Sequence, residues 1–518
     1  MAEVKKMPDY GASGQGLLDG FLYKCNTFNE LAEYLLTKAK PVDFLAREKQ
    51  GLKNKLESSE KKLYNSKLSD EEKTKLSEKI ANIDAVLKRK KSASRNTIIV
   101  ETIDVLIKLT SHNSINFLCA SNGKIYCYLT SHWNEIDSKE FRNFIKKFVI
   151  KLGATKYLAK HFKFVDELEN QFKSESSRDF ENKENQNAIL INFQNGTYNF
   201  KTKKLESHSP VDNLTYVLKF DYNPESKSPL FDKFIDEVLT DKQKQNVLAE
   251  FIASVFIKKD ILKLEKLLLL YGVGANGKSV VFDIVQKLLG AENITNFSLE
   301  SLSDKSGYTR AEIENKLLNY SSEISSRTNP DFLKQMASGE PIPAREIYGK
   351  PFQVYNYAKL MFNANVLPKD TEDTDGFFRR FLIIHFDKVI PQDKQDNELA
   401  KKIIENELSG VFNWVMQGFE RLIKNKSFSP CESSDKIVAQ YRTHSDSVAM
   451  YLNEANAKKS LNGIKIKELY DRYRAFCIAS GYKTNNRSKL EESLQNKGYT
   501  IDKVYKVKNA FIEVDSVD

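Results

Sequence analysis

The chain has 518 residues, of which 41% are hydrophobic and 29% are charged, and its formal net charge is +10. This length allows about two to four domains with real cores, and the composition is normal for a water-soluble protein. The longest apolar run, near Leu267–Leu270, is far too short to cross a membrane, and the polar start of the chain lacks the apolar core of a signal peptide. Composition therefore argues against a membrane protein, and the basic charge permits nucleic-acid binding without proving it.

The cysteines are spread along the chain. They form no Cys-x-x-Cys pair, and no histidine stands near them at metal-ligand spacing. Disulfide frameworks and zinc sites need such spacings, whereas a cytosolic protein keeps its thiols reduced. We therefore expect neither a zinc site nor a disulfide framework, and we expect a cytoplasmic setting.

Residues 1–94 are predicted to form a helical, charged, coiled-coil-like arm. Leucines recur at heptad-like spacing, and Ser69 with Glu72 has the pattern of a capping box at the start of a helix. Two long helices, paired as an antiparallel hairpin, would account for this pattern. The arm would serve self-assembly, or its basic end, Lys88–Lys91, would contact nucleic acid.

Residues 95–240 are predicted to form an α+β domain. Several segments alternate like strands, at 115–119, 124–129, 188–193 and 197–200. Asn195-Gly196 is a strong hairpin signal. A helix is expected at 141–150 and a polar loop at 172–187.

Residues 241–390 contain the candidate residues for phosphate binding and catalysis. The apolar run Leu267–Leu270 leads into a glycine-rich turn and then into a helical pattern. Glycines allow successive N–H groups to point at a phosphate, and the positive end of the following helix lies at the same place. Lys278 would reach the β- and γ-phosphates of ATP, and the Ser279 hydroxyl would ligate Mg²⁺. The expected nucleotide-binding residues are Gly272, Gly274, Ala275, Asn276, Gly277, Lys278, Ser279 and Val280. A chance match in an ordinary turn is the alternative.

Two further predicted strands end in polar residues that suit ATP hydrolysis. Glu323 follows an apolar segment and would orient the attacking water and support Mg²⁺, although Ser322 precedes it where a second acid is common. Asn365 follows another apolar segment and would contact the γ-phosphate. The alternatives are an ordinary glutamate at a strand end and a turn asparagine.

Arg379 and Arg380 stand just before a third predicted strand. Arginine suits the charge that develops on a transferring phosphoryl group. An arginine that acts on a neighbouring subunit implies a ring. One of the pair could instead make a structural salt bridge, and the sequence does not tell which.

The rest of the chain is predicted to be mainly helical. Residues 391–430 form a helical extension. Residues 436–518 have helical patterns at 436–455, 464–479 and 487–497, followed by strand-like 504–507 and 510–514. Three helices followed by a hairpin are typical of a winged-helix domain.

The order and spacing of these motifs resemble superfamily 3 helicases, and most of all the phage and plasmid primase-helicases and the poxvirus primase-helicase group. The resemblance rests on Gly272–Ser279, the strand ending in Glu323, the run Lys359–Pro368 and Phe378-Arg379-Arg380, and it extends to Phe220–Pro224. It covers residues 185–515 well and 95–185 weakly. It implies an α/β fold with an AAA+-like P-loop ATPase core that forms a hexameric ring and moves 3′→5′ on DNA.

The resemblance also implies a loop between Glu323 and Asn365 that enters the central channel of the ring and holds single-stranded DNA. Lysine and arginine would pair with phosphates there, and tyrosine would stack on a base or sugar. The expected channel residues are Lys334, Arg345, Tyr348 and Lys350. In the winged helix, Arg487 and Lys489 would hold duplex DNA through its phosphates.

A primase would need paired carboxylates for two metal ions, and residues 1–190 contain no convincing pair. With no primase site expected there, the resemblance implies an ATP-dependent replicative DNA helicase of a phage, plasmid or mobile element, in the cytoplasm of a bacterial host. Its partners would be further copies of itself, DNA, and replication initiator or primase proteins. The alternatives are a helicase with a divergent primase, and an ATP-switched origin-binding or regulatory protein that does not unwind DNA.

Overall fold

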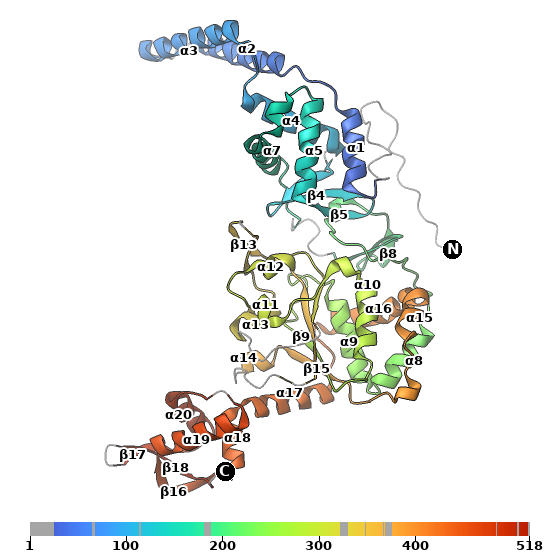
Figure 1. The fold of residues 1–518 in the computed structure, drawn as a ribbon, viewed down its shortest axis with the longest axis vertical. Helices are drawn as coiled ribbons and strands as arrows, with labels where there is room; N and C mark the ends of the chain where they lie inside the picture. The colour runs from blue at the N-terminus through green and yellow to red at the C-terminus, as the bar shows by residue number, and fades with distance from the viewer. Residues whose placement is uncertain are drawn as a thin grey trace. The chain divides into compact units, whose positions relative to one another are not determined.

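The computed structural model describes residues 25–64, 68–112, 115–180, 188–321, 330–347, 349–365, 367, 375–482, 484–504 and 507–515. The chain divides into two compact units (Figure 1). Unit 1 consists of Met1–Asn192 with Gly196–Val217, and unit 2 consists of Phe193–Asn195 with Leu218–Asp518. In the described part of the chain, every helix is too short or too polar to cross a membrane.

Unit 1 packs helices against a small antiparallel sheet of order β3-β4-β5. Figure 1 shows α1, α4, α5 and α7 on one side of strands β4 and β5. The core contains large side chains with no solvent exposure, among them Trp133, Phe141 and Phe148. The helices are α1 (Phe28–Lys38), α2 (Phe44–Leu63), α3 (Asp70–Arg89), α4 (Arg95–Thr110), α5 (Ser138–Lys151), α6 (Lys156–Lys160) and α7 (Phe162–Glu175).

The strands of this region are β1 (Ser111–His112), β2 (Ile115–Asn116), β3 (Leu118–Ser121), β4 (Lys124–Leu129), β5 (His132–Ile136), β6 (Leu190–Phe193), β7 (Gly196–Asn199) and β8 (Lys204–Glu206), and a 3-10 turn covers Pro210–Asp212. A hairpin forms where the Asn195-Gly196 signal predicts one: Gln194-Asn195 connects β6 to β7, and Gly196 is the first residue of β7. Helix α7 reaches Glu175, so the expected loop at 172–187 begins later than predicted. The residues 181–187 of that loop lie outside the described part.

Within the predicted arm of residues 1–94, α2 and α3 pair as a hairpin, whereas α1 packs into the core of unit 1 and residues 1–24 lie outside the described part. Ser69 and Glu72 form the predicted capping box: the Glu72 N–H donates to the Ser69 hydroxyl at 3.3 Å, and the Ser69 N–H donates to the Glu72 carboxylate at 2.8 Å. These bonds hold the pKa of the Glu72 carboxyl below its usual value. Helix α3 buries no residue fully, and α2 buries only Phe44 and Ser59.

Unit 2 is built on a parallel sheet of order β10-β11-β14-β9-β15. Because the sheet is parallel, the carboxyl ends of all its strands meet at one edge. Leu267–Leu270 of the central strand β9 are fully buried, which explains why this strand is a continuous apolar run. The strands are β9 (Leu267–Tyr271), β10 (Ile294–Thr295), β11 (Leu318–Ser321), β14 (Lys359–Ala364) and β15 (Phe381–His385).

Helices cover this sheet and carry the connections between its strands. They are α8 (Pro229–Val238), α9 (Lys242–Ser254), α10 (Lys278–Leu289), α11 (Leu299–Leu302), α12 (Tyr308–Glu312), α13 (Pro330–Ala337), α14 (Asp375–Phe378), α15 (Leu399–Asn406) and α16 (Leu408–Asn425), with 3-10 turns at Ala291–Asn293 and Gln392–Lys394. The predicted helical extension at 391–430 thus contains α15 and α16.

The segment expected to be one long channel loop is more ordered than predicted. Leu333–Ala337 belong to helix α13, whose Leu333 and Met336 pack into the core. The residues that follow form an antiparallel hairpin of β12 (Ile342–Arg345) and β13 (Pro351–Val354). Its short connection, residues 346–350, is what remains of the predicted loop.

The C-terminal region has one strand more than the sequence predicts. Its elements are α17 (Glu432–Ser445), α18 (Ser447–Glu454), β16 (Lys458–Lys465), α19 (Ile466–Ser480), α20 (Arg487–Asn496), β17 (Ile501–Val504) and β18 (Val507–Glu513). They include a sheet of order β16-β18-β17. The helix predicted at 436–455 is interrupted at Asp446, whose carboxylate caps α18 by accepting from the N–H groups of Val448 and Ala449.

Candidate functional site

The glycine loop, residues 272–277, connects β9 to α10 at the carboxyl edge of the sheet. Gly272 has φ +148° and Gly277 has φ +87°, both in the region that favours glycine. A Cβ on Gly272 would lie 2.5 Å from the Phe386 carbonyl oxygen, and one on Gly277 would lie 2.8 Å from Val238 Cγ1. Both glycines are therefore required by close packing, while Gly274 has open space around it.

Lys278 is the first residue of α10, and its ammonium turns back into the loop. The side chain is buried, and Nζ donates to the Gly272 carbonyl at 2.6 Å, to the Val273 carbonyl at 3.0 Å and to Asn276 Oδ1 at 3.0 Å. Burial lowers the pKa of this ammonium. Ser279, the next residue, is exposed. A cation held by carbonyls beside an open hydroxyl is a suitable environment for an anion such as phosphate.

The loop is supported by the segment after β15, which the sequence did not indicate. Asn276 is buried, and its side-chain amide donates to the Phe386 carbonyl at 3.1 Å. The Ile390 N–H donates to the Ala275 carbonyl at 2.8 Å. One observation could have indicated this contact. Strands β15 and β9 are parallel neighbours, so the segment after β15 begins at the same edge of the sheet as the glycine loop.

Asn365 lies beside the glycine loop. The Gly272 N–H donates to the carbonyl of Ala364, the last residue of β14, at 3.1 Å. Asn365 follows directly and is exposed. The structure thus brings Asn365 and Lys278 to one edge of the sheet. Glu323 lies outside the described residues; the strand before it, β11, ends at Ser321 at this same edge.

The two arginines before β15 have different surroundings. Arg380 is buried, and its guanidinium donates to the Ser338 hydroxyl and to the Gly376 carbonyl. The Arg379 side chain is 64% exposed, and its nearest carboxylate partner is Glu265 at 4.0 Å. Arg380 therefore holds the fold, and Arg379 is the one available to a ligand or a partner.

The predicted channel residues separate into two groups. Lys334 lies on α13, partly buried, with its ammonium 2.7 Å from the Asp331 carboxylate. Arg345 and Lys350 are exposed and flank the tip of the β12–β13 hairpin, where Arg345 Nε donates to the Gly349 carbonyl at 3.0 Å. Tyr348 lies outside the described residues.

Arg487 and Lys489 are exposed at the start of α20. The Asn486 side chain caps this helix by accepting from the Lys489 N–H at 2.9 Å. Arg487 also lies 3.4 Å from the Glu491 carboxylate. Both side chains therefore present positive charge at a helix N-terminus, as a phosphate contact requires.

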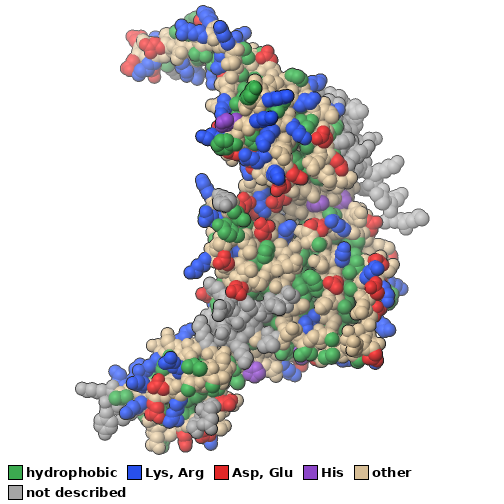
Figure 2. All heavy atoms as spheres, viewed as in Figure 1, with side chains coloured by type: hydrophobic (Ala, Val, Ile, Leu, Met, Phe, Trp, Pro, Cys, Tyr) green, Lys and Arg blue, Asp and Glu red, His purple; other side chains and the backbone are tan. Residues whose placement is uncertain are grey.

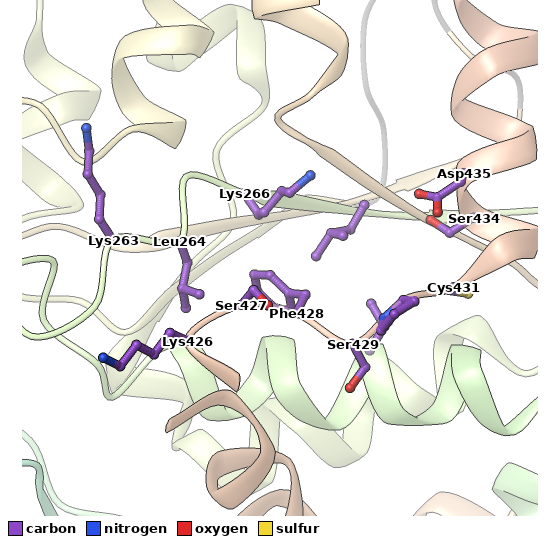
Figure 3. A pocket seen from close by; sticks show the side chains of 13 residues that line it. Lys263, Leu264, Lys266, Lys426, Ser427, Phe428, Ser429, Cys431, Ser434 and Asp435 are labelled. Atoms are coloured by element: carbon purple, nitrogen blue, oxygen red, sulfur yellow. The ribbon is translucent and has the colours of Figure 1, made fainter. Parts of the chain in front are cut away.

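A separate pocket of about 310 Å³ lies at the opposite edge of the sheet (Figure 3). Lys266, just before β9, and Leu382, near the start of β15, contribute to its wall. Lys266 Nζ donates to the Arg379 carbonyl at 2.5 Å, and burial lowers its pKa. The complete lining is Val247, Lys263, Leu264, Lys266, Leu382, Lys426, Ser427, Phe428, Ser429, Pro430, Cys431, Ser434 and Asp435.

Comparison with known proteins gives partial matches. The family described as "D5 N terminal like" matches residues 104–240, and a family of unknown function, DUF5906, matches residues 270–380. A curated relative is the "Putative helicase L207/L206" of Acanthamoeba polyphaga mimivirus, which is 23% identical over 491 residues. That alignment covers 80% of this chain and 48% of the relative, so the chain spans about half the length of the curated relative it matches.

The resemblance to the phage and viral primase-helicase group is confirmed. Solved structures add a loose likeness only. The apo form of the "NrS-1 C terminal region" matches with a TM-score of 0.45 and 13% identity, covering 80% of this chain and 98% of that one. A second NrS-1 C-terminal structure, an A form, has a TM-score of 0.44 and 13% identity over 77% of this chain and 95% of that one.

Proposed function

We propose that this chain is an ATP-dependent DNA helicase of the replication type, and that the glycine loop is its phosphate-binding loop. The observation that carries the proposal is Lys278: its ammonium sits within the loop, at the start of α10 and at the edge where Asn365 emerges. The name of the mimivirus relative and the "D5 N terminal like" match support the replication context.

In this proposal each residue of the loop has a definite task. The backbone N–H groups and the N-terminus of α10 hold the β- and γ-phosphates, and Lys278 exchanges its carbonyl partners for phosphate oxygens. The exposed Ser279 hydroxyl is a hard oxygen ligand of the kind Mg²⁺ takes, together with phosphate and water oxygens. The ion would neutralise charge on the phosphates. Asn365 would align water or contact the γ-phosphate, and Glu323 would orient the attacking water.

The position of Arg379 supports a site shared between subunits. Arg379 precedes β15, whose first residue Phe381 pairs with Leu267 at the amino end of β9. The glycine loop begins at the other end of β9, about 16 Å away for a five-residue strand. An arginine at this edge suits a neighbour's nucleotide better than its own, which is the arrangement of a ring, here proposed to be a hexamer.

Two exposed basic features support contact with DNA. Arg345 and Lys350 flank the hairpin tip that would enter the channel, moving along a strand 3′→5′ as nucleotide is turned over. The C-terminal order of helix, strand, two helices and two strands supports a winged helix, with Arg487 and Lys489 at the start of α20. Both features would act through phosphates and would therefore weaken as salt rises.

Strand displacement on forked DNA tests the proposal. Lys278→Ala should abolish both ATP hydrolysis and unwinding, whereas Lys287→Ala, which changes an exposed lysine on the same helix, should leave both unchanged. Thermal melting should show both variants folded. Normal unwinding by Lys278→Ala would refute the assignment. DNA-stimulated hydrolysis without strand separation would favour the ATP-switched regulatory protein, and primer synthesis on a single-stranded template would favour a helicase-primase.

A further inference from the structure

Unit 1 carries a basic surface at the turn from α5 through α6 into α7. Between Glu140 and Asp166 the sequence contains seven Lys or Arg and no Asp or Glu. Figure 2 shows Lys and Arg side chains gathered over this part of unit 1. The exposed lysines at the turn that make no ion pair with any described residue are Lys151, Lys156, Lys160 and Lys163.

The nearest acids do not neutralise this charge, because other partners hold them. Asp166 and Glu169 both bind Arg142, at 2.5 and 3.0 Å, and Glu167 binds Arg95 at 2.6 Å. The turn therefore keeps its positive charge in the folded unit.

Two aromatic rings stand among these lysines. Tyr157 is 92% exposed and Phe162 is 63% exposed. The Phe162 ring stacks on His161, with centroids 5.4 Å apart, and the Lys163 ammonium lies 6.0 Å from its centroid. Phe162 is the first residue of α7, whose N-terminus has no side-chain cap. Exposed rings, ammonium groups without a described ion-pair partner and an uncapped helix N-terminus thus lie within one short segment, residues 151–163.

We propose that this α6 patch, formed by Lys151, Lys156, Tyr157, Lys160, Phe162 and Lys163, binds a single-stranded nucleic acid. Aromatic rings stack on unpaired bases of any sequence, and lysines follow the phosphates. The first turn of α7 adds the positive end of a 14-residue helix. The patch belongs to unit 1, whereas the glycine loop belongs to unit 2, so the proposal extends the proposed function without depending on an active glycine loop.

The composition of the patch disfavours the other possible partners. A membrane-binding helix needs a broad apolar face, but α6 has five residues and turns Leu158 and Ala159 inward. A protein interface is typically depleted in lysine at its centre, whereas lysine makes up most of this patch. Unpaired bases are the partner that uses both the rings and the charges.

Binding of the full chain to a labelled oligothymidylate, without ATP, tests the proposal. Tyr157→Ala should weaken binding about tenfold, and Tyr157→Phe should restore most of it. Lys156→Gln with Lys160→Gln should reduce the slope of log K against log salt by about 1.4, because each lost phosphate contact removes about 0.7. Matched controls on α2 and just after it are Tyr64→Ala, at a tyrosine that is 87% exposed, and Lys61→Gln with Lys62→Gln.

Photocrosslinking separates this patch from other DNA-binding surfaces. A 4-thiothymidine oligonucleotide should crosslink to a peptide that contains Tyr157 or Phe162, and oligouridylate should compete with it more strongly than duplex of equal length. No crosslink in residues 151–163, together with unchanged binding by Tyr157→Ala, would overturn the proposal. An effect of Tyr157→Ala confined to anionic vesicles, or to self-association, would overturn it as well. Lys278→Ala should retain the crosslink, which distinguishes failure here from failure of the proposed ATPase.

Discussion

Arg380 and Ser338 are joined by two hydrogen bonds, from Nε at 3.1 Å and from Nη2 at 2.8 Å to one serine hydroxyl. Both residues are buried, so removing the guanidinium leaves this hydroxyl without the donors that satisfy it. Arg380→Ala should therefore lower the free energy of unfolding by about 2–3 kcal/mol. Urea denaturation measures this loss. A value within about 0.5 kcal/mol of the wild type would show that Arg380 does not hold the fold.

Arg379→Ala should leave stability nearly unchanged but reduce ATP hydrolysis. The side chain is largely exposed, and its ion pair with Glu265 is long, so stability should change by less than about 0.5 kcal/mol. If Arg379 completes a neighbour's site, ATP hydrolysis should fall about 10³-fold. Arg379→Lys, which keeps the charge but loses the fork of donors, should recover only part of the rate. The steady-state rate of ATP hydrolysis at saturating DNA, compared among wild type, Arg379→Ala and Arg379→Lys, tests this prediction.

Mixing variants tests whether the site is shared. In the proposed ring, Lys278→Ala chains would lack a functional loop, and Arg379→Ala chains would lack the arginine that reaches a neighbour. A mixed ring contains some interfaces where an intact loop meets an intact arginine. Hydrolysis should therefore reappear on mixing, to a fraction of the wild-type rate. Two inactive variants that stay inactive at every mixing ratio would contradict a shared site, provided that sedimentation shows mixed assemblies.

The glycines of the loop are predicted to differ in what they tolerate. Gly272→Ala should destabilise the fold by more than about 2 kcal/mol, because a Cβ would meet the Phe386 carbonyl oxygen at 2.5 Å in a backbone conformation that favours glycine. Gly274→Ala should change stability by less than about 0.5 kcal/mol, since its Cβ would meet nothing within 4 Å. Equal losses for the two variants, measured by chemical denaturation, would contradict this reading.

The strand and helix around the loop were predictable, because a buried apolar run and an amphipathic pattern flank the glycines. The different roles of Arg379 and Arg380 were not, since only the fold brings Ser338 to one of them. Strand β16 was missed because Lys458–Lys465 is polar and mostly exposed, so it shows no alternation of apolar and polar residues. Helix α13 was read as a loop, although the residues that it buries are spaced as in a helix.

Glu250 anchors the region that follows α16, and its removal should be costly. The carboxylate is fully buried, and it accepts from Arg421 Nε at 2.8 Å and from the Ser429 N–H and hydroxyl at 2.7 and 2.6 Å. Glu250→Ala should destabilise unit 2 by about 3–5 kcal/mol, because it leaves a partly buried arginine unpaired. Ser429→Ala removes one of these bonds and should cost about 1 kcal/mol. Calorimetry would contradict this account if the two losses were similar.

His385 should make stability depend on pH. Burial, with the nearby positive charge of Lys244, lowers the pKa of this imidazole in the folded state. The unfolded chain then binds more protons below its ordinary pKa of about 6.5, so stability is complete above that pH and falls as the pH drops through it. The group is partly solvated, so the effect should be a fraction of a kcal/mol. His385→Gln should reduce the difference between the unfolding free energies measured at neutral and at mildly acidic pH. An unchanged difference would show that His385 does not contribute to the pH dependence of stability.

The Lys278 ammonium donates to three oxygens of its own loop. An anion that binds Lys278 must therefore compete with oxygens of the lysine's own loop. The net free energy of binding is the difference between the new contacts and the contacts that are lost. A small monovalent anion offers too few oxygens to win that exchange, whereas a polyphosphate can satisfy the ammonium and the loop N–H groups together. Under the proposed function, this exchange would favour a polyphosphate over chloride or inorganic phosphate.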